Sequence, residues 1–449
     1  MPTEAGDAST PIRKAADELH GTTRLWGVLA RHRDFRMLFA GNSISLLGSS
    51  VTMVALPLTA VVYLHASPAQ MGLLGAVALL PHLILGLPAG VWVNRIPYRR
   101  ILLLADTAQT LLLGSVPILA AFGLLRMWHL YAIVTLAGVA NLFETVTAQS
   151  FTPLLVPREE LFPANSVLML SNATVNTTGS ALGGVLVMLF GAPKAIAVDA
   201  ISFLISGLCK ARIRHPGQAA DSTAPCTLHL RADILEGLGA VFSHRIIRAV
   251  ILAATVGAFA GQLQAVVLVL FFVRDLHLSS DLVGAAIAVS GIASILGAMM
   301  ATRFTRRVGP GPAFITGMFL ASTAGLILAF AAGPLRLSLA IPLLAQILRG
   351  TGPSIYGINQ QTFRQAMIAP ALLSRANATW RFLAYGGQSL GALLGGLLGS
   401  AFGLRTTLVI SSRIMLASTA IALMSPLRSL LELAARQVHD EKAATLRKR

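Results

Sequence analysis

The sequence predicts an all-α polytopic membrane protein, with twelve transmembrane helices arranged as two parallel six-helix pseudo-repeats. Three observations lead to this fold class: an apolar composition, apolar runs of membrane-spanning length, and a repeat within the chain. The 449 residues have a mean hydropathy of +0.72 and only 12% of them are charged, whereas soluble proteins average about 25%. An ordinary soluble domain is therefore excluded.

Apolar runs of about 20 residues are long enough to cross about 30 Å of hydrocarbon as a helix. The predicted spans cover residues 37–63, 71–93, 101–123, 129–154, 166–190, 193–209, 246–273, 281–302, 311–332, 337–362, 378–402 and 404–425. We expect them to form two six-helix bundles, 37–209 and 246–425. The polar segments around the bundles are a cytoplasmic N-terminal segment, 1–36, a cytoplasmic central loop, 210–245, and a basic tail, 426–449.

Lysine and arginine are distributed unevenly between the two sides of the predicted membrane. Of the 35 basic residues, 28 fall on the side of the N-terminus and 5 on the other side. Because basic loops stay on the cytoplasmic side, we expect a multi-pass protein of the cell (inner) membrane with both termini in the cytoplasm. The same asymmetry explains the net charge of +17 without a nucleic-acid partner, and it predicts attraction to anionic membrane lipids.

The two halves of the chain repeat each other at a constant offset of 212 residues. Asn165 matches Asn377 at this offset, and Gln149 matches Gln361. Several glycines, including Gly191 and Gly403, match as well. One offset held over most of each half predicts two six-span units in parallel orientation, with a transport site between them.

The loop between the second and third spans, GVWVNRIPYRR, contains a glycine followed by basic residues. Gly90, Arg95, Arg99 and Arg100 fit a pattern that resembles the major facilitator superfamily. The resemblance covers nearly the whole chain and is strongest to the drug-exporter branch that includes macrolide and enterobactin exporters. It implies that this loop is a gating loop that latches the halves in the outward-facing state. Asn94 stands where relatives carry an acid, so this loop lacks the carboxylate of a charge-based latch.

Glycines in the fifth and eleventh spans form stripes of small residues. The fifth-span segment TGSALGGVL also resembles a glycine motif of exporters that is associated with antiport, with Ser180 in place of a proline. Such stripes let helix backbones approach closely. We therefore expect a helix-packing role for Gly179, Gly183, Gly184, Gly391, Gly395 and Gly396.

Two ionisable residues lie in spans that line the central cavity in the superfamily: Glu144 in the fourth and Arg349 in the tenth. At the repeat offset they share a helix face but differ in depth by about 10 Å, so no direct salt bridge is assumed. Tyr356, the repeat equivalent of Glu144, is a candidate hydrogen-bond partner. Glu144 is interpreted either as a substrate-binding or proton-coupling group, or as a buried structural carboxylate bonded to neighbouring helices.

The remaining charges within spans are interpreted as structural: Asp106, Asp199 and Arg413. Asp106 lies near the cytoplasmic end of the third span, where Arg99 or Arg100 is its expected partner. Uncharged polar side chains near mid-depth are further candidates for substrate binding or proton coupling: Asn42, Asn141, Ser50, Gln262, Gln346, Asn172 and Asn176.

These features predict a secondary active transporter that exports a small amphipathic organic compound, such as a drug, antibiotic or siderophore-like molecule, by alternating access and proton antiport. The alternatives are an importer or facilitator of a small metabolite and a transporter-like ligand sensor. The sequence contains no Walker motif and no pair of histidines at metal-ligand spacing. We therefore expect no enzyme activity, cofactor or metal, and a monomer as the working unit.

Overall fold

A computed structural model describes residues 27–93, 95–157, 160–215, 245–331, 335–367 and 370–425. Helices dominate these ranges, which contain no strand. Nine of the described helices are long and apolar enough to cross a membrane. The predicted all-α membrane fold is confirmed. The tail 426–449, most of the central loop and most of the N-terminal segment lie outside the described residues.

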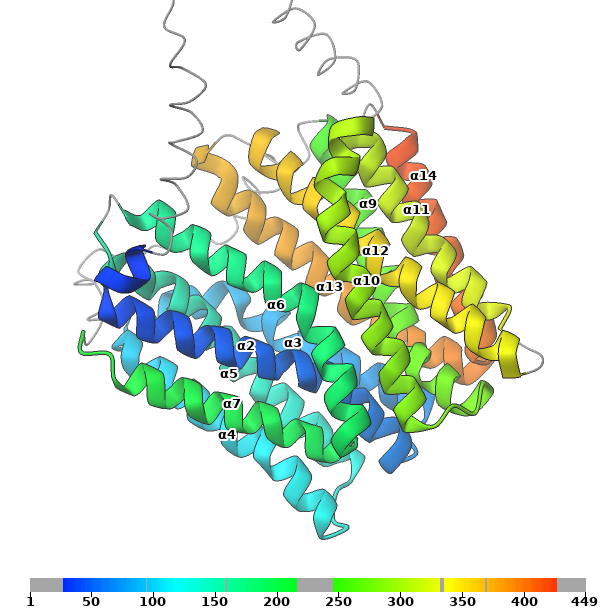
Figure 1. The fold of residues 1–449 in the computed structure, drawn as a ribbon, viewed down its shortest axis with the longest axis horizontal. Helices are drawn as coiled ribbons and strands as arrows, with labels where there is room; N and C mark the ends of the chain where they lie inside the picture. The colour runs from blue at the N-terminus through cyan, green and yellow to red at the C-terminus, as the bar shows by residue number, and fades with distance from the viewer. Residues whose placement is uncertain are drawn as a thin grey trace, which may run out of the picture.

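Twelve long helices follow one another in the described ranges (Figure 1). The first six are α2 (Arg33–Leu58, continued by a π-helical turn Thr59–Tyr63), α3 (Pro68–Val93), α4 (Tyr98–Ala121), α5 (Met127–Leu155), α6 (Leu161–Phe190) and α7 (Ala192–Ala211). The last six are α9 (Arg245–Leu270, continued by Phe271–Asp275), α10 (Ser280–Val308), α11 (Pro310–Ala329), α12 (Leu335–Met367), α13 (Pro370–Phe402) and α14 (Leu404–Leu423).

Several helices are longer than the apolar runs that predicted them. Helix α12 has 33 residues, which corresponds to about 50 Å at 1.5 Å per residue, well beyond the hydrocarbon thickness. Helix α10 continues through Arg306 and Arg307. Hydropathy marks only the part of a helix in hydrocarbon, because backbone hydrogen bonding continues into the polar region.

The 212-residue repeat is present in the backbone itself. Helices α2 and α9, their π-helical turns, and helices α7 and α14 begin and end at equivalent positions. Even the unusual backbone angles recur: φ is 52° at His65 and 51° at His277, and it is 79° at Gly191 and 83° at Gly403. Figure 1 shows the first six helices, blue to green, beside the last six, light green to red.

Glycines form the closest contacts between the two halves. A Cβ added to Gly72 of α3 would lie 2.7 Å from the Cα of Gly396 in α13. At the repeat-equivalent contact, a Cβ added to Gly284 of α10 would lie 2.9 Å from the carbonyl oxygen of Gly184 in α6. Side chains at these positions would separate the backbones, so the halves approach closely only because both helices carry glycine.

The other predicted packing glycines lie at crossings within each half. Gly179 and Gly183 of α6 face Ser50 and its carbonyl oxygen on α2. Gly391 and Gly395 of α13 face the backbone of Phe259 and Leu263 on α9 in the same way. One glycine stripe therefore serves two contacts, one with the neighbouring helix and one with the other half.

In the described part of the structure, three hydrogen bonds between the halves lie near one face of the membrane. We call the face where α2 begins and α14 ends the terminal face, and the opposite one the far face. Arg274 donates to the carbonyl oxygens of His65 (3.0 Å) and Ala66 (2.7 Å), and the backbone N–H of Ala69 donates to Ser400 Oγ at 3.1 Å. These bonds and the glycine contacts hold the halves together at the far face.

Candidate functional site

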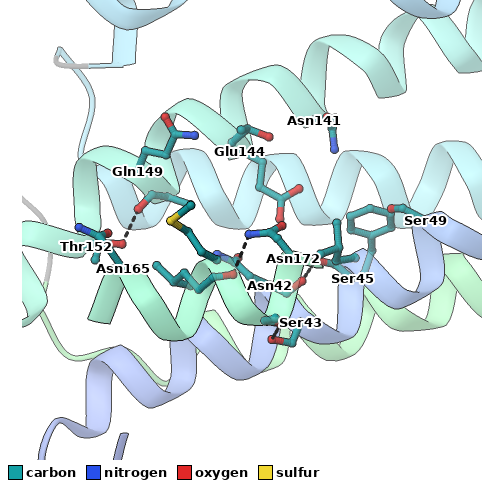
Figure 2. A pocket seen from close by; sticks show the side chains of 17 residues that line it. Asn42, Ser43, Ser45, Ser49, Asn141, Glu144, Gln149, Thr152, Asn165 and Asn172 are labelled. Carbon is teal, nitrogen blue, oxygen red and sulfur yellow. Dashed lines mark hydrogen bonds between the residues drawn. The ribbon is translucent and has the colours of Figure 1, made fainter. Parts of the chain in front are cut away.

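A polar cavity of about 510 Å³ lies among α2, α5, α6 and α7, in the half of the first bundle nearer the terminal face. Its lining is Asn42, Ser43, Ser45, Leu46, Ser49, Asn141, Glu144, Thr145, Ala148, Gln149, Thr152, Asn165, Leu168, Met169, Ser171, Asn172 and Phe203. Figure 2 shows Glu144 among amide and hydroxyl side chains that project from facing helices. Twelve of the 17 lining residues have side chains that can donate or accept hydrogen bonds, and among these residues only Glu144 is ionisable.

Four predicted candidates meet at this cavity: Glu144, Asn42, Asn141 and Asn172. Sequence reasoning did not select Gln149 and Asn165 as site residues, although both line the cavity. The sequence feature that could have identified them is the repeat, because both recur in the second half as Gln361 and Asn377.

Glu144 belongs to a buried charged cluster that extends away from the cavity and contains Lys210 and Asp106. Lys210 Nζ of α7 lies 2.6 Å from Glu144 Oε1 of α5 and 3.0 Å from Asp106 Oδ1 of α4. The side chains of Lys210 and Asp106 are 0% and 1% exposed, and that of Glu144 is 8% exposed. Because one ammonium group bridges two carboxylates, the cluster ties three helices together.

The remaining carboxylate oxygens of the cluster also have partners. Gln109 Nε2 donates to Glu144 Oε2 at 2.8 Å, and Ser206 Oγ donates to Asp106 Oδ2 at 3.2 Å. Gly41 of α2 leaves room for the side chains of Ser206 and Lys210, because a Cβ at this position would lie 3.2 Å from Ser206 Oγ and 3.4 Å from Lys210 Cε. The cluster is thus fully hydrogen-bonded, which buried charges require.

The expected partners of Asp106 and Glu144 were wrong. Arg99 donates instead to the carbonyl oxygen of Ala211 at 2.6 Å, and Asp106 bonds Lys210 and Ser206. Lys210 had been assigned to the central loop because the apolar run ends before it. Helix α7 continues through this residue, and its side chain turns back along the helix, as helical side chains do.

The second half has no charges at the equivalent positions. Met318, Tyr356 and Ala422 are the repeat equivalents of Asp106, Glu144 and Lys210. Met318 and Ala422 belong to an apolar cluster with Phe314, and Tyr356 packs against it, edge to face with Phe314 at 6.2 Å between ring centroids. Tyr356 is therefore core rather than a partner of Glu144. The same helix arrangement packs without the charged cluster.

Other predicted candidates lie away from the cavity. Ser50 donates to the carbonyl oxygen of Leu46 beside Gly179. Gln346 donates to the carbonyl oxygen of Ala286 at 3.1 Å, within the second half. Gln262 lies across from Gly75 of α3. The side chain of Asn176 on α6 is outside the described part of the structure.

The remaining predicted charges differ in their surroundings. Asp199 is 1% exposed and accepts a hydrogen bond from Ser202 at 3.2 Å, so it is bonded within the first half. Arg413, midway along α14, is exposed. Within the described residues, Arg349 and Arg413 have no hydrogen bond or ion pair.

The predicted gating loop begins in α3, which contains Gly90. Arg95 and Arg100 are exposed, and Arg99 caps the end of α7 in the same half. Asn94 lies outside the described residues. Arg99 therefore makes its described contact within the first half.

Comparison with known proteins identifies the family. The model of the Major Facilitator Superfamily matches residues 38–368, and a second match covers residues 250–444. This chain belongs to the major facilitator superfamily. The predicted resemblance is confirmed, and the protein is a multi-pass membrane transporter rather than an enzyme.

Relatives of this transporter include named efflux proteins. Multidrug efflux pump Tap of Mycolicibacterium fortuitum is 26% identical over 395 residues, covering 87% of this chain and 95% of that protein. Macrolide efflux protein A of Streptococcus pyogenes is 24% identical over 231 residues, covering 50% of this chain and 55% of that protein. The drug-exporter branch predicted from the sequence is thus represented among the relatives.

Solved structures share the transporter's fold. The nucleoside transporter NupG has a TM-score of 0.64 at 13% identity, covering 87% of this chain and 98% of that chain. A bacterial homologue of the iron transporter ferroportin, in an inward-facing state, has a TM-score of 0.66 at 16% identity, covering 87% of this chain and 98% of that chain. At these identities the likeness shows the fold alone.

Proposed function

We propose that this transporter exports a small amphipathic organic compound from the cytoplasm by alternating access, in exchange for protons. The observation that carries the proposal is Glu144, a carboxylate in the wall of a polar cavity and bonded to Lys210. Ionisable groups at membrane depth are costly and mark substrate or proton pathways. The efflux activities named for two relatives support the direction of transport.

The lining of the cavity favours a substrate with both polar and apolar parts. Amide and hydroxyl groups can satisfy a ligand's own hydrogen-bonding groups, and Leu46, Met169 and Phe203 supply apolar contacts. Glu144 favours a cationic amine at one end of the ligand. We infer that a single chain suffices as the working unit, because it contains both halves of the fold.

The excess of basic residues on the terminal face supports a cytoplasmic location for both termini. The cavity lies nearer that face, so substrate would enter it from the cytoplasm. Single cysteines placed at residue 20 or 230 of a variant without native cysteines are expected to resist a membrane-impermeant thiol reagent in intact cells. Efficient labelling at either position would reverse the assigned orientation.

Replacing Glu144 with glutamine tests proton coupling. Glutamine keeps the size of the side chain and its ability to hydrogen-bond, but it carries no negative charge and cannot titrate. We expect inside-out vesicles with the wild type to accumulate radiolabelled erythromycin when the lumen is acidified, and an uncoupler to abolish this accumulation. The Glu144→Gln variant should lose at least tenfold in gradient-driven accumulation, or about 1.4 kcal/mol of coupling free energy.

The matched control is Asp199→Asn, a change at another buried carboxyl group that does not line the cavity. It should retain gradient-driven accumulation. Wild-type accumulation by Glu144→Gln would assign Glu144 a structural role. Uptake into right-side-out vesicles driven by an inward proton gradient would favour an importer. Binding of erythromycin without transport would favour a ligand sensor.

A further inference from the structure

The charged cluster contains two carboxylates and one ammonium group. Without an added proton its formal charge is −1, and with one proton it is neutral. A net charge buried at membrane depth is costly, so the neutral state holds one proton on Asp106 or on Glu144.

Hydrogen bonding distinguishes the two carboxyl groups. Both oxygens of Glu144 face N–H donors, from Lys210 and Gln109, so a proton on Glu144 requires the whole Gln109 amide to reverse and present its oxygen. Asp106 Oδ2 faces the hydroxyl group of Ser206. A hydroxyl group can rotate to accept instead of donate, and it can therefore accommodate a proton on Asp106.

Lys210 is hydrogen-bonded to both carboxyl groups. Its Nζ atom lies 2.6 Å from Glu144 Oε1 and 3.0 Å from Asp106 Oδ1. An ammonium group can donate to an ionised carboxylate and also to the carbonyl oxygen of a neutral carboxyl group. Both bonds are therefore compatible with an ionised Glu144 and a neutral Asp106.

We propose that Asp106 holds the exchangeable proton and that Lys210 couples it to substrate binding at Glu144. This inference rests on the proposed antiport. When an organic cation binds the Glu144 carboxylate, the ammonium group of Lys210 shifts its charge toward Asp106. Asp106 then loses its proton to water. The cluster and its ligand are neutral after the step, and one positive charge leaves as the proton, so charge balances.

The surroundings of Asp106 leave Lys210 as the connecting group. Helix α7 contributes Lys210 and Ser206, and helix α5 contributes Glu144. Gly207 of α7 also lies against the Asp106 side chain and carries no charge. Glu144 lines the cavity, whereas Asp106 does not. Substrate and proton thus occupy different carboxyl groups, and each weakens the binding of the other by the same factor.

Infrared difference spectroscopy of the purified, substrate-free transporter tests the assignment. A protonated carboxyl group has its own C=O stretching band, which disappears as rising pH removes the proton. We expect this band in the wild type, its loss in Asp106→Asn, and its retention in Glu144→Gln. Asp199→Asn identifies any contribution from the other buried carboxyl group. Ser206→Ala should shift the frequency of the Asp106 band, because it removes the hydroxyl partner.

Three results would overturn the proposal: no such band in the wild type, a band that survives in the Asp106→Asn/Asp199→Asn double variant with no loss in Asp106→Asn alone, or a band lost in Glu144→Gln. If Asp106→Asn does not fold, an unshifted band in Ser206→Ala would overturn it equally. The measurement needs no substrate. A band on Asp106 together with the absence of erythromycin export would therefore contradict the proposed function while leaving the proton assignment intact.

Discussion

Replacing Lys210 with alanine is expected to destabilise the folded transporter by about 3–5 kcal/mol, the usual effect of removing one partner from a buried ion pair. The substitution leaves Asp106 and Glu144 buried without the cation that bridges them. Thermal unfolding of the purified protein, followed by light scattering or tryptophan fluorescence, measures the effect. Acidification should restore part of the lost stability, because protonation of Glu144 removes its uncompensated charge.

Lys194→Ala is the matched control for this substitution. Lys194 is exposed at the opposite end of the same helix, so its removal should change stability by less than about 0.5 kcal/mol. Equal stability of the Lys210→Ala variant and the wild type would show that the carboxylates do not depend on Lys210 for neutralisation.

The second large effect is expected from a variant that copies the packing of the second half into the first. This repeat-derived variant combines Asp106→Met, Gln109→Ala, Glu144→Tyr and Lys210→Ala. Each new residue stands at the equivalent position of the second half, where an apolar cluster fills the space. Replacing buried ion pairs by packed apolar residues is often neutral or stabilising. The variant should fold, yet lose proton-driven export.

The sequence predicted Glu144 as a site residue because a carboxylate stands alone in an apolar run. The side chains that bond to Glu144 were harder to predict. Lys210 lies 66 residues away in sequence, at the end of an apolar run where basic residues normally belong to a loop. A lysine side chain can reach back by about a helical turn, so its charge can lie deeper than its Cα. A hydropathy profile assigns each residue to its place along the backbone, so it cannot predict the depth at which a long side chain ends.

The fold could be predicted more completely than the site. The repeat offset anticipated equivalent helix ends, because each half conserves its glycines and its turns. The offset also linked Glu144 to Tyr356, but not their different surroundings. Whether an equivalent position holds a charge or a core residue depends on the neighbouring helices, as Met318 and Ala422 show beside Tyr356.

The most direct test of the cluster's role in coupling measures gradient-driven erythromycin accumulation by the repeat-derived variant in inside-out vesicles. Protein amount and thermal stability are matched to the wild type in the same preparation. We expect a folded protein, at least as stable as the wild type, whose accumulation no longer responds to an acidic lumen. Accumulation equal to the wild type, with the same dependence on the proton gradient, would contradict a role of Asp106, Lys210 and Glu144 in transport and leave them a structural one.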